Sequence, residues 1–130
     1  MEILTHQKID RELCGTPVET GDGFAVIQMT LPERARADAT GLVHGGFIFG
    51  LADYAAMLAV NRPTVVLAAA EVSFKKPVLA GETLRARGDV ISSQGKKRTV
   101  SVTVSRGDDI VFEGTFSCAV PDKHVAEGKG

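Results

Sequence analysis

Alternating apolar and polar residues predict several β-strands. Residues 82–92 and 97–106 each place small apolar residues on one face and polar residues on the other. A third alternating strand is expected over residues 110–120, with one face made by Ile110, Phe112, Phe116 and Cys118. An earlier strand is expected over residues 24–31, ending at Pro32. Residues 64–74 contain six consecutive apolar residues, which is typical of a strand buried on both faces.

The longest apolar segment, residues 42–60, predicts a helix in the protein core. Asp53 is the one charged residue between His44 and Asn61, and the segment is rich in the helix formers alanine, leucine and methionine. A helix that is apolar on every side is usually buried, and this one is too short to cross a membrane comfortably. A short amphipathic helix is also expected over residues 2–13, and a flexible tail over residues 121–130.

These elements predict an α+β protein, in which one antiparallel sheet of five to six strands curls around one long central helix. Residues 1–120 form a single domain in this interpretation. One helix cannot cover so wide a sheet, and an apolar strand near an edge favours pairing with another chain. We therefore expect a homodimer in which the strands over residues 64–74 face each other across a two-fold axis.

Composition narrows the class of partner. The 130 residues are 44% hydrophobic and 24% charged, as in an ordinary soluble domain, and the net charge of −1 argues against binding nucleic acid. The cysteines Cys14 and Cys118 are too few for a disulfide framework or a cysteine zinc site, and we interpret both as packing residues. The first residues lack the apolar core of a signal peptide. A cytoplasmic protein with no membrane partner is expected.

The charges are unevenly distributed along the chain. Residues 75–106 contain eight basic and two acidic side chains, whereas the remainder contains seven basic and fourteen acidic ones. Such a basic stretch is able to receive a small polyanion, for example the phosphates of a nucleotide. The alternative is that it forms only the solvated outer face of the sheet.

Candidate chemistry gathers around the start and middle of the long helix. Gly45 and Gly46 follow His44 directly, and the free N–H groups of a helix N-terminus favour an oxygen that gains negative charge. Asp53 lies in an apolar helix, where an unpaired carboxylate costs several kcal/mol unless it is paired or used. The alternatives are a glycine-lined helix entry needed for packing, a structural aspartate, and a histidine that holds the loop. The three histidines, at positions 6, 44 and 124, are too scattered to indicate a metal site.

At these residues the sequence resembles the hotdog-fold acyl-CoA thioesterases, in particular the phenylacetate-pathway type. The first motif is Gly41-x-Val43-His44-Gly45-Gly46, followed by Leu51-Ala52-Asp53 with the acid nine residues after the histidine. Further matches are Phe74-Lys75-Lys76-Pro77-Val78, Gly81-Glu82-x-Leu84 and Gln94-Gly95-Lys96. The resemblance extends from about residue 23 to residue 120.

The resemblance implies hydrolysis of an acyl-CoA ester at the interface of a homodimer or a dimer of dimers. Gly45 and Gly46, next to His44, would polarise the thioester carbonyl, and Asp53 of the other subunit would act as general base or nucleophile. The CoA phosphates would meet basic residues among Lys75, Lys76, Lys96, Lys97 and Arg98. No cofactor is implied, because the CoA ester is itself the substrate.

One departure from the family concerns the substrate site. Many relatives carry asparagine or glutamine six residues before the histidine, where this chain has Asp38. A second carboxylate near the carbonyl would repel developing negative charge unless it is protonated or turned away. Two alternatives to hydrolysis remain open: a non-catalytic acyl-CoA-binding domain, and a hotdog enoyl-CoA hydratase.

Overall fold

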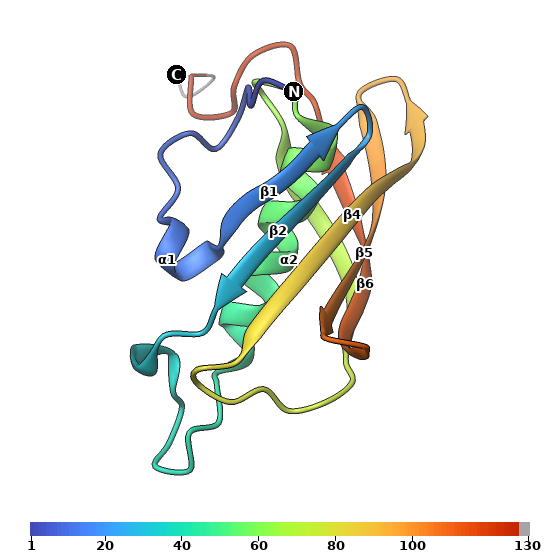
Figure 1. The fold of residues 1–130 in the computed structure, drawn as a ribbon. Helices are drawn as coiled ribbons and strands as arrows, with labels where there is room; N and C mark the ends of the chain where they lie inside the picture. The colour runs from blue at the N-terminus through green and yellow to red at the C-terminus, as the bar shows by residue number, and fades with distance from the viewer. Residues whose placement is uncertain (128–130) are drawn as a thin grey trace.

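The computed structural model describes residues 1–127, which form a six-stranded sheet, one long helix and two short helical turns (Figure 1). The strands are β1 (Thr16–Gly21), β2 (Phe24–Thr30), β3 (Val66–Phe74), β4 (Thr83–Gln94), β5 (Lys97–Arg106) and β6 (Asp109–Ala119). The helical elements are α1 (Arg11–Cys14), the 3-10 turn η1 (Glu33–Ala35) and α2 (Gly45–Val60).

The sheet has the order β1-β2-β4-β5-β6-β3, and every neighbouring pair is antiparallel. The hairpin turns between β4 and β5 and between β5 and β6 contain Gly95 and Gly107, both at a φ of 59°, which glycine adopts without strain. The predicted α+β architecture with one antiparallel sheet and one long helix is confirmed. The edge strand β1 was not predicted, and Pro17 within it obscures its pattern.

Helix α2 lies across the concave side of the sheet, over β2, β4 and β5 (Figure 1). It approaches β4 so closely that a Cβ atom at Gly88 would stand 2.9 Å from the carbonyl oxygen of Ala55. The buried side chains of α2 form the core together with the inward residues of β2, β4, β5 and β6. The prediction that this helix is buried on every side is wrong, because Gly46 is exposed and Gly50 and Asp53 are half-buried.

Strand β3 differs most from its prediction. It lies at one edge of the sheet, where α2 covers little of it, and Ala68, Ala69, Ala70 and Glu71 are exposed. Burial on both faces is therefore wrong for the single chain. The strand instead presents an apolar, unpaired edge to solvent, which is a surface suited to strand pairing.

Strand β6 contains one extra residue. The pairing with β5 runs from Val104 opposite Phe112 to Ser105 opposite Ile110, so Val111 has no partner across the ladder. This bulge moves Val111 into the core and leaves Ile110 46% exposed. The expectation that Ile110 shares a buried face with Phe112 is therefore wrong.

The first ten residues are irregular, so the predicted helix over residues 2–13 is wrong except at its end. His6 has a φ of 54°, which no right-handed helix continues, and α1 begins only after Asp10, whose side chain caps it. The side chain of Asn61, at the end of α2, fastens this segment by binding the Leu4 N–H and the Glu2 carbonyl. Residues 121–127 of the predicted tail form turns, and residues 128–130 lie outside the described residues.

Candidate active site

The entry of α2 presents free backbone donors. His44 is the N-cap residue; its N–H donates to the Ala35 carbonyl at 3.0 Å, and its own carbonyl accepts from Phe47. Within residues 1–127, no protein acceptor takes the N–H groups of Gly45 or Gly46. These donors lie at the positive end of the helix dipole, where they are able to stabilise an oxyanion.

Both glycines lie close to an aromatic ring. A Cβ atom at Gly45 would stand 3.2 Å from the ring of Phe74, and one at Gly46 would stand 3.1 Å from the imidazole of His44. The exposed His44 side chain makes no capping hydrogen bond, and its ring meets Phe47 edge to face. His44 and Phe74 therefore flank the two donors, and any larger residue there would displace one of the rings.

Asp53 is the one charged residue of α2. Its Oδ1 atom is buried and has no hydrogen-bond partner among the described residues. Burial raises the pKa of this carboxyl from 3.8 to about 6. An ionised oxygen without a partner costs free energy in an apolar environment. A carboxylate at such a position therefore has a functional role more often than a structural one.

The surroundings of Asp53 include both thiols of the chain. The negative charge of Asp53 contributes to the raised pKa values of Cys14 and Cys118, after burial, which is the larger cause. The pKa of Cys118 reaches about 11, so this buried thiol stays protonated and unreactive at neutral pH. This environment agrees with the prediction that both cysteines are packing residues.

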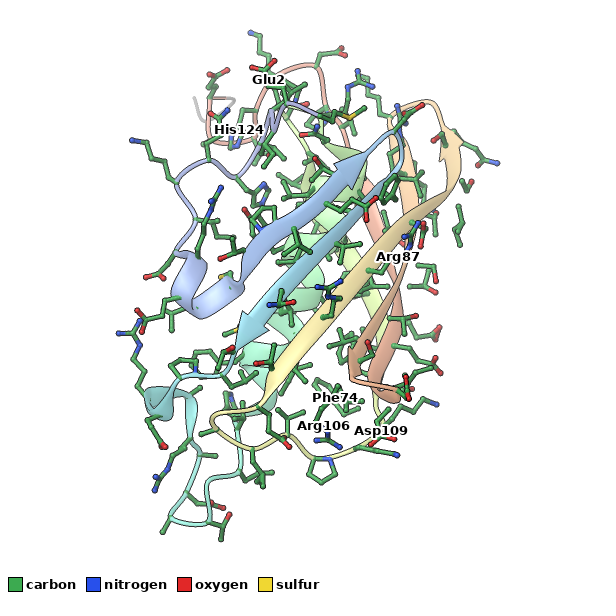
Figure 2. The ribbon with its side chains drawn as sticks, viewed as in Figure 1. Glu2, Phe74, Arg87, Arg106, Asp109 and His124 are labelled. Atoms are coloured by element: carbon green, nitrogen blue, oxygen red, sulfur yellow. The ribbon has the colours of Figure 1, made fainter. Side chains whose placement is uncertain are left out.

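An open pocket of about 320 Å³ lies beside the helix entry. Gly45 and Ile48 of α2 line one side, and Phe74 with the segment 75–78 lines the other. Phe74 is 54% exposed although it packs edge to face against Phe112, 5.0 Å between ring centroids. Figure 2 shows Phe74, Arg106 and Asp109 together at this end of the molecule. The sequence did not single out Phe74 as a pocket wall, because the contact joins segments about 30 residues apart.

The predicted CoA-binding cations fall into two groups. Lys75 and Lys76 line the pocket beside Gly45, where they pair with Glu113 at 3.1 Å and Asp109 at 3.0 Å. The second group lies on the β4–β5 hairpin, near the other end of α2 (Figure 1): Lys96, Lys97 and Arg98. A single chain therefore does not bring the five cations together.

Asp38 forms hydrogen bonds within its own loop. Its Oδ1 atom accepts from the backbone N–H of Thr40 at 2.9 Å and from the Thr40 hydroxyl at 2.6 Å, within the loop before α2. The hydroxyl bond is the largest cause of a lowered pKa for this exposed carboxyl. The Asp38 carboxylate therefore has hydrogen-bond partners within its own loop, and its repulsion of a substrate oxyanion stays a prediction.

Comparisons with known proteins identify the family of this chain. A family model described as the thioesterase superfamily matches residues 40–113, the part of the chain that carries the helix entry and Asp53. The chain belongs to the thioesterase superfamily. The acyl-coenzyme A thioesterase PaaI of Escherichia coli is 35% identical over 85 residues, covering 64% of this chain and 59% of that protein. Its solved structure superposes with a TM-score of 0.78 over 86% of this chain and 83% of its own, and at 24% identity this shows the fold alone.

Other proteins to which the chain is similar carry different names. An uncharacterized protein of Pyrococcus horikoshii, PH1136, has a solved structure with 49% identity, a TM-score of 0.96 and 97% coverage of both chains. A methylthioribose-1-phosphate isomerase of Aquifex aeolicus is 50% identical over 89% of this chain but only 25% of its own length. Transcription factor FapR of a Thermoanaerobacter species is 31% identical over 65% of this chain and 42% of its own. The chain thus spans between a quarter and three fifths of these curated relatives.

Two further observations concern metals and membranes. Among residues 1–127, no three histidine, cysteine or acidic side chains gather as a metal site would need. No helix in that range is long and apolar enough to span a bilayer.

Proposed function

We propose that the protein hydrolyses acyl-CoA thioesters at a site that two copies of the chain complete. The observation that carries this proposal is the half-buried Asp53, whose buried Oδ1 atom has no partner among the described residues and which lies two helical turns from the free donor of Gly46. A general base and an oxyanion site are the two elements that acyl transfer to water requires.

The spacing along α2 supports a site shared between chains. Gly46 and Asp53 are seven residues apart, which is close to two turns and about 10 Å along a helix axis. One thioester carbonyl cannot contact both groups of the same helix, because a base and an oxyanion donor act within about 3 Å of the reacting atoms. A second helix that runs in the opposite direction would bring its own Asp53 to the first Gly46.

The exposed edge of β3 supplies a surface for this second copy. Two-fold pairing of β3 with its counterpart would join two sheets and cover Ala68, Ala69 and Ala70. In such a dimer the two α2 helices run antiparallel. The β4–β5 hairpin of one copy then lies toward the helix entry of the other. The second chain would therefore supply three cations to the CoA site: Lys96, Lys97 and Arg98.

Hydrolysis in this arrangement uses one water molecule and moves one proton through Asp53. The thioester carbonyl oxygen accepts from the N–H groups of Gly45 and Gly46, while Asp53 of the other chain takes a proton from water. The resulting hydroxide forms the new C–O bond, and the C–S bond breaks as the tetrahedral intermediate collapses. The CoA thiolate receives the proton from Asp53, which returns to its carboxylate form. In the alternative route, Asp53 attacks the carbonyl carbon, and the C–S bond breaks with loss of the CoA thiolate to leave a mixed anhydride. Water then cleaves the anhydride to the free acid and regenerates Asp53, and the thiolate takes up the proton released in that step.

The lysines of the pocket suit the phosphate end of the substrate. Lys75 and Lys76 are half exposed, and ion pairs at such exposure are worth only about 0–1 kcal/mol. Phosphate oxygens are therefore able to displace Glu113 and Asp109 at little cost. The apolar pocket between these lysines and Gly45 would then receive the pantetheine arm.

The test is release of CoA thiol from a panel of acyl-CoA esters by wild type and D53N. We expect turnover in the variant to fall by about 10²–10⁴, the usual contribution of a positioned base, with no loss of thermal stability. D89N is the matched control, because Asp89 pairs with Arg87 on the outer face of the sheet. Equal turnover of D53N and wild type would overturn the mechanism.

A second candidate function is acyl-CoA binding without turnover. The similarity to the transcription factor FapR favours it, since the name of that relative describes a regulator. Calorimetry distinguishes the two functions: binding of acyl-CoA by the wild type with no release of free thiol would favour the binding domain.

A further inference from the structure

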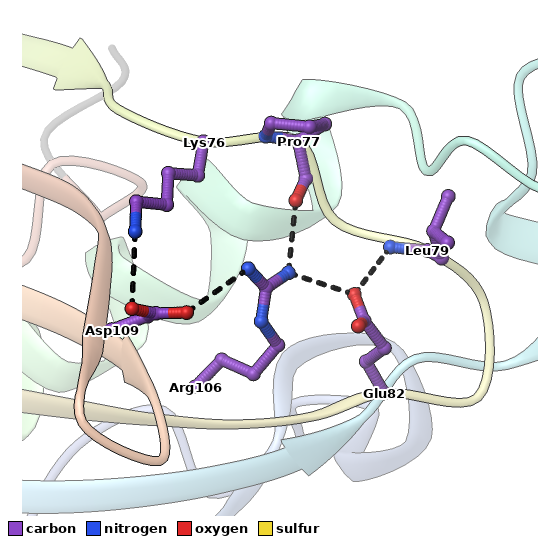
Figure 3. Close-up of polar contacts among 6 residues, drawn as sticks. All are labelled: Lys76, Pro77, Leu79, Glu82, Arg106 and Asp109. Carbon is purple, nitrogen blue, oxygen red and sulfur yellow. Dashed lines mark hydrogen bonds and ion pairs between the residues drawn. The ribbon is translucent and has the colours of Figure 1, made fainter.

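Arg106, at the end of β5, joins two segments at the rim of the pocket (Figure 3). Its Nη1 atom donates to the Pro77 carbonyl at 2.9 Å and to Glu82 Oε1 at 3.0 Å, and its Nη2 atom lies 3.7 Å from Asp109 Oδ2. Glu82 Oε1 in turn accepts from the Leu79 N–H at 2.7 Å. One guanidinium thus fastens both ends of the loop between β3 and β4.

Arg106 is more buried than the other ion-paired cations of the chain. Its side chain is 27% exposed and that of Glu82 is 30% exposed, whereas the remaining paired residues are 40% exposed or more. Lower exposure reduces screening by water, so a charge-assisted hydrogen bond is worth more here than at an open surface. This pair is therefore the one ion pair of the described chain that we expect to hold a loop in place.

The loop that Arg106 fastens carries the two lysines of the pocket. Lys75 and Lys76 both donate their backbone N–H groups to Val111, the extra residue of β6, at 2.7 and 3.2 Å. Farther along the loop, the Val78 carbonyl accepts from Val43, two residues before Gly45, at 2.8 Å. The position of Pro77 thus sets where the lysines stand relative to the helix entry.

We propose that Arg106 is a positioning residue for the phosphate end of the CoA ester, acting through Pro77 on Lys75 and Lys76. The inference rests on the proposed function and adds to it a residue that would not itself touch the substrate. The planar guanidinium of Arg106 binds a carbonyl and a carboxylate at once, which the single ammonium of a lysine does less well.

The experiment compares wild type, R106Q, R106K and R87Q, each with an acyl-CoA ester and with the corresponding acyl-pantetheine, which lacks the nucleotide phosphates. We expect R106Q to raise KM for the CoA ester about tenfold, the equivalent of one lost charged hydrogen bond, with kcat within about twofold of wild type. R106K should restore part of the loss. KM for the pantetheine ester should not change in any variant.

R87Q is the matched control, because Arg87 forms an equally short ion pair, with Asp89, on the outer face of the sheet (Figure 2). If Arg106 were only structural, R106Q would lower the melting temperature and leave both KM values unchanged. That result, or an equal rise of KM for both esters, would overturn the inference.

Failure of the inference and failure of the proposed function give different results. If the wild type turns over no ester, titration calorimetry with acyl-CoA takes the place of KM, and the same tenfold difference in Kd between wild type and R106Q is expected. If the wild type neither hydrolyses nor binds any CoA ester, the proposed function and the role of Arg106 are both wrong.

Discussion

Gly46 and Asp53 lie on the same face of α2, two helical turns apart, and neither the Gly46 N–H nor the Asp53 Oδ1 atom has a partner among the described residues. Because each residue turns the helix by about 100°, Asp53 lies within about 20° of Gly46 around the helix axis. In the proposed dimer, each chain would therefore contribute half of two sites rather than the whole of one.

The pH dependence of hydrolysis should report the pKa of Asp53. Its pKa is raised to about 6 by burial, and the base must be ionised to accept a proton. We expect kcat/KM to rise tenfold per pH unit below about 6 and to level off above 7. A stopped assay from pH 4.5 to 8.5 measures this profile, and a flat profile across pH 5–7 would contradict the assignment.

The same carboxyl should make the fold less stable as the pH rises. Because its pKa is higher in the folded chain than in the unfolded chain, the folded state binds the proton more tightly. That stabilisation is complete below pH 4 and is lost as the pH rises through 6. We expect D53N to be more stable than wild type by up to about 3 kcal/mol at pH 8. The two should converge toward pH 4, as urea unfolding at several pH values would show; D89N should follow the wild type throughout.

A methyl group at Gly45 should disturb the donors without unfolding the protein. The new Cβ would stand 3.2 Å from the Phe74 ring, which is exposed enough to move but would then leave the pocket wall. We expect G45A to lose about tenfold or more in kcat, because small displacements of positioning groups are costly. The double variant G45A/F74L should recover part of this activity. No recovery would mean that the ring is not the cause.

A charge on β3 should separate the proposed dimer. Ala69 is exposed in the middle of the edge strand, and a lysine there opposes strand-to-strand pairing. We expect A69K to be monomeric by light scattering, with a circular dichroism spectrum like that of the wild type and turnover lost. V18K on β1, the other edge of the sheet, is the control and should stay dimeric. A wild type that is monomeric at micromolar concentration would contradict both the dimer and the shared site.

The sequence predicted the parts of the fold that depend on regular alternation. Val100, Val102 and Val104 face the core as expected, since a period of two fixes the face of every residue in an undisturbed strand. The prediction failed where β6 gains Val111, because one inserted residue reverses the pattern and nothing local marks it. It also failed for β3, where an apolar run indicated burial that the single chain does not provide.

The residues of the candidate site likewise include some that the sequence could predict and some that it could not. Asp53 and Gly45 stand out in the sequence because a charge within an apolar helix and paired glycines at its start are unusual in their own segments. The contacts of Arg106 with Pro77 and Glu82 join residues 29 and 24 positions apart, and these follow from the turn between β5 and β6 rather than from any local pattern. Residues of that kind are found only when the strands have been placed.

The bulge at Val111 has a consequence for attempts to idealise this protein. A redesigned β6 without the extra residue would pair with β5 without interruption, and its apolar and polar residues would alternate regularly. It would also remove the carbonyl that accepts from both Lys75 and Lys76, and with it a contact that holds this segment of the pocket wall. We expect such a deletion to give a protein that folds well but binds CoA esters poorly, because the residue that interrupts the strand also supports the segment that carries the lysines.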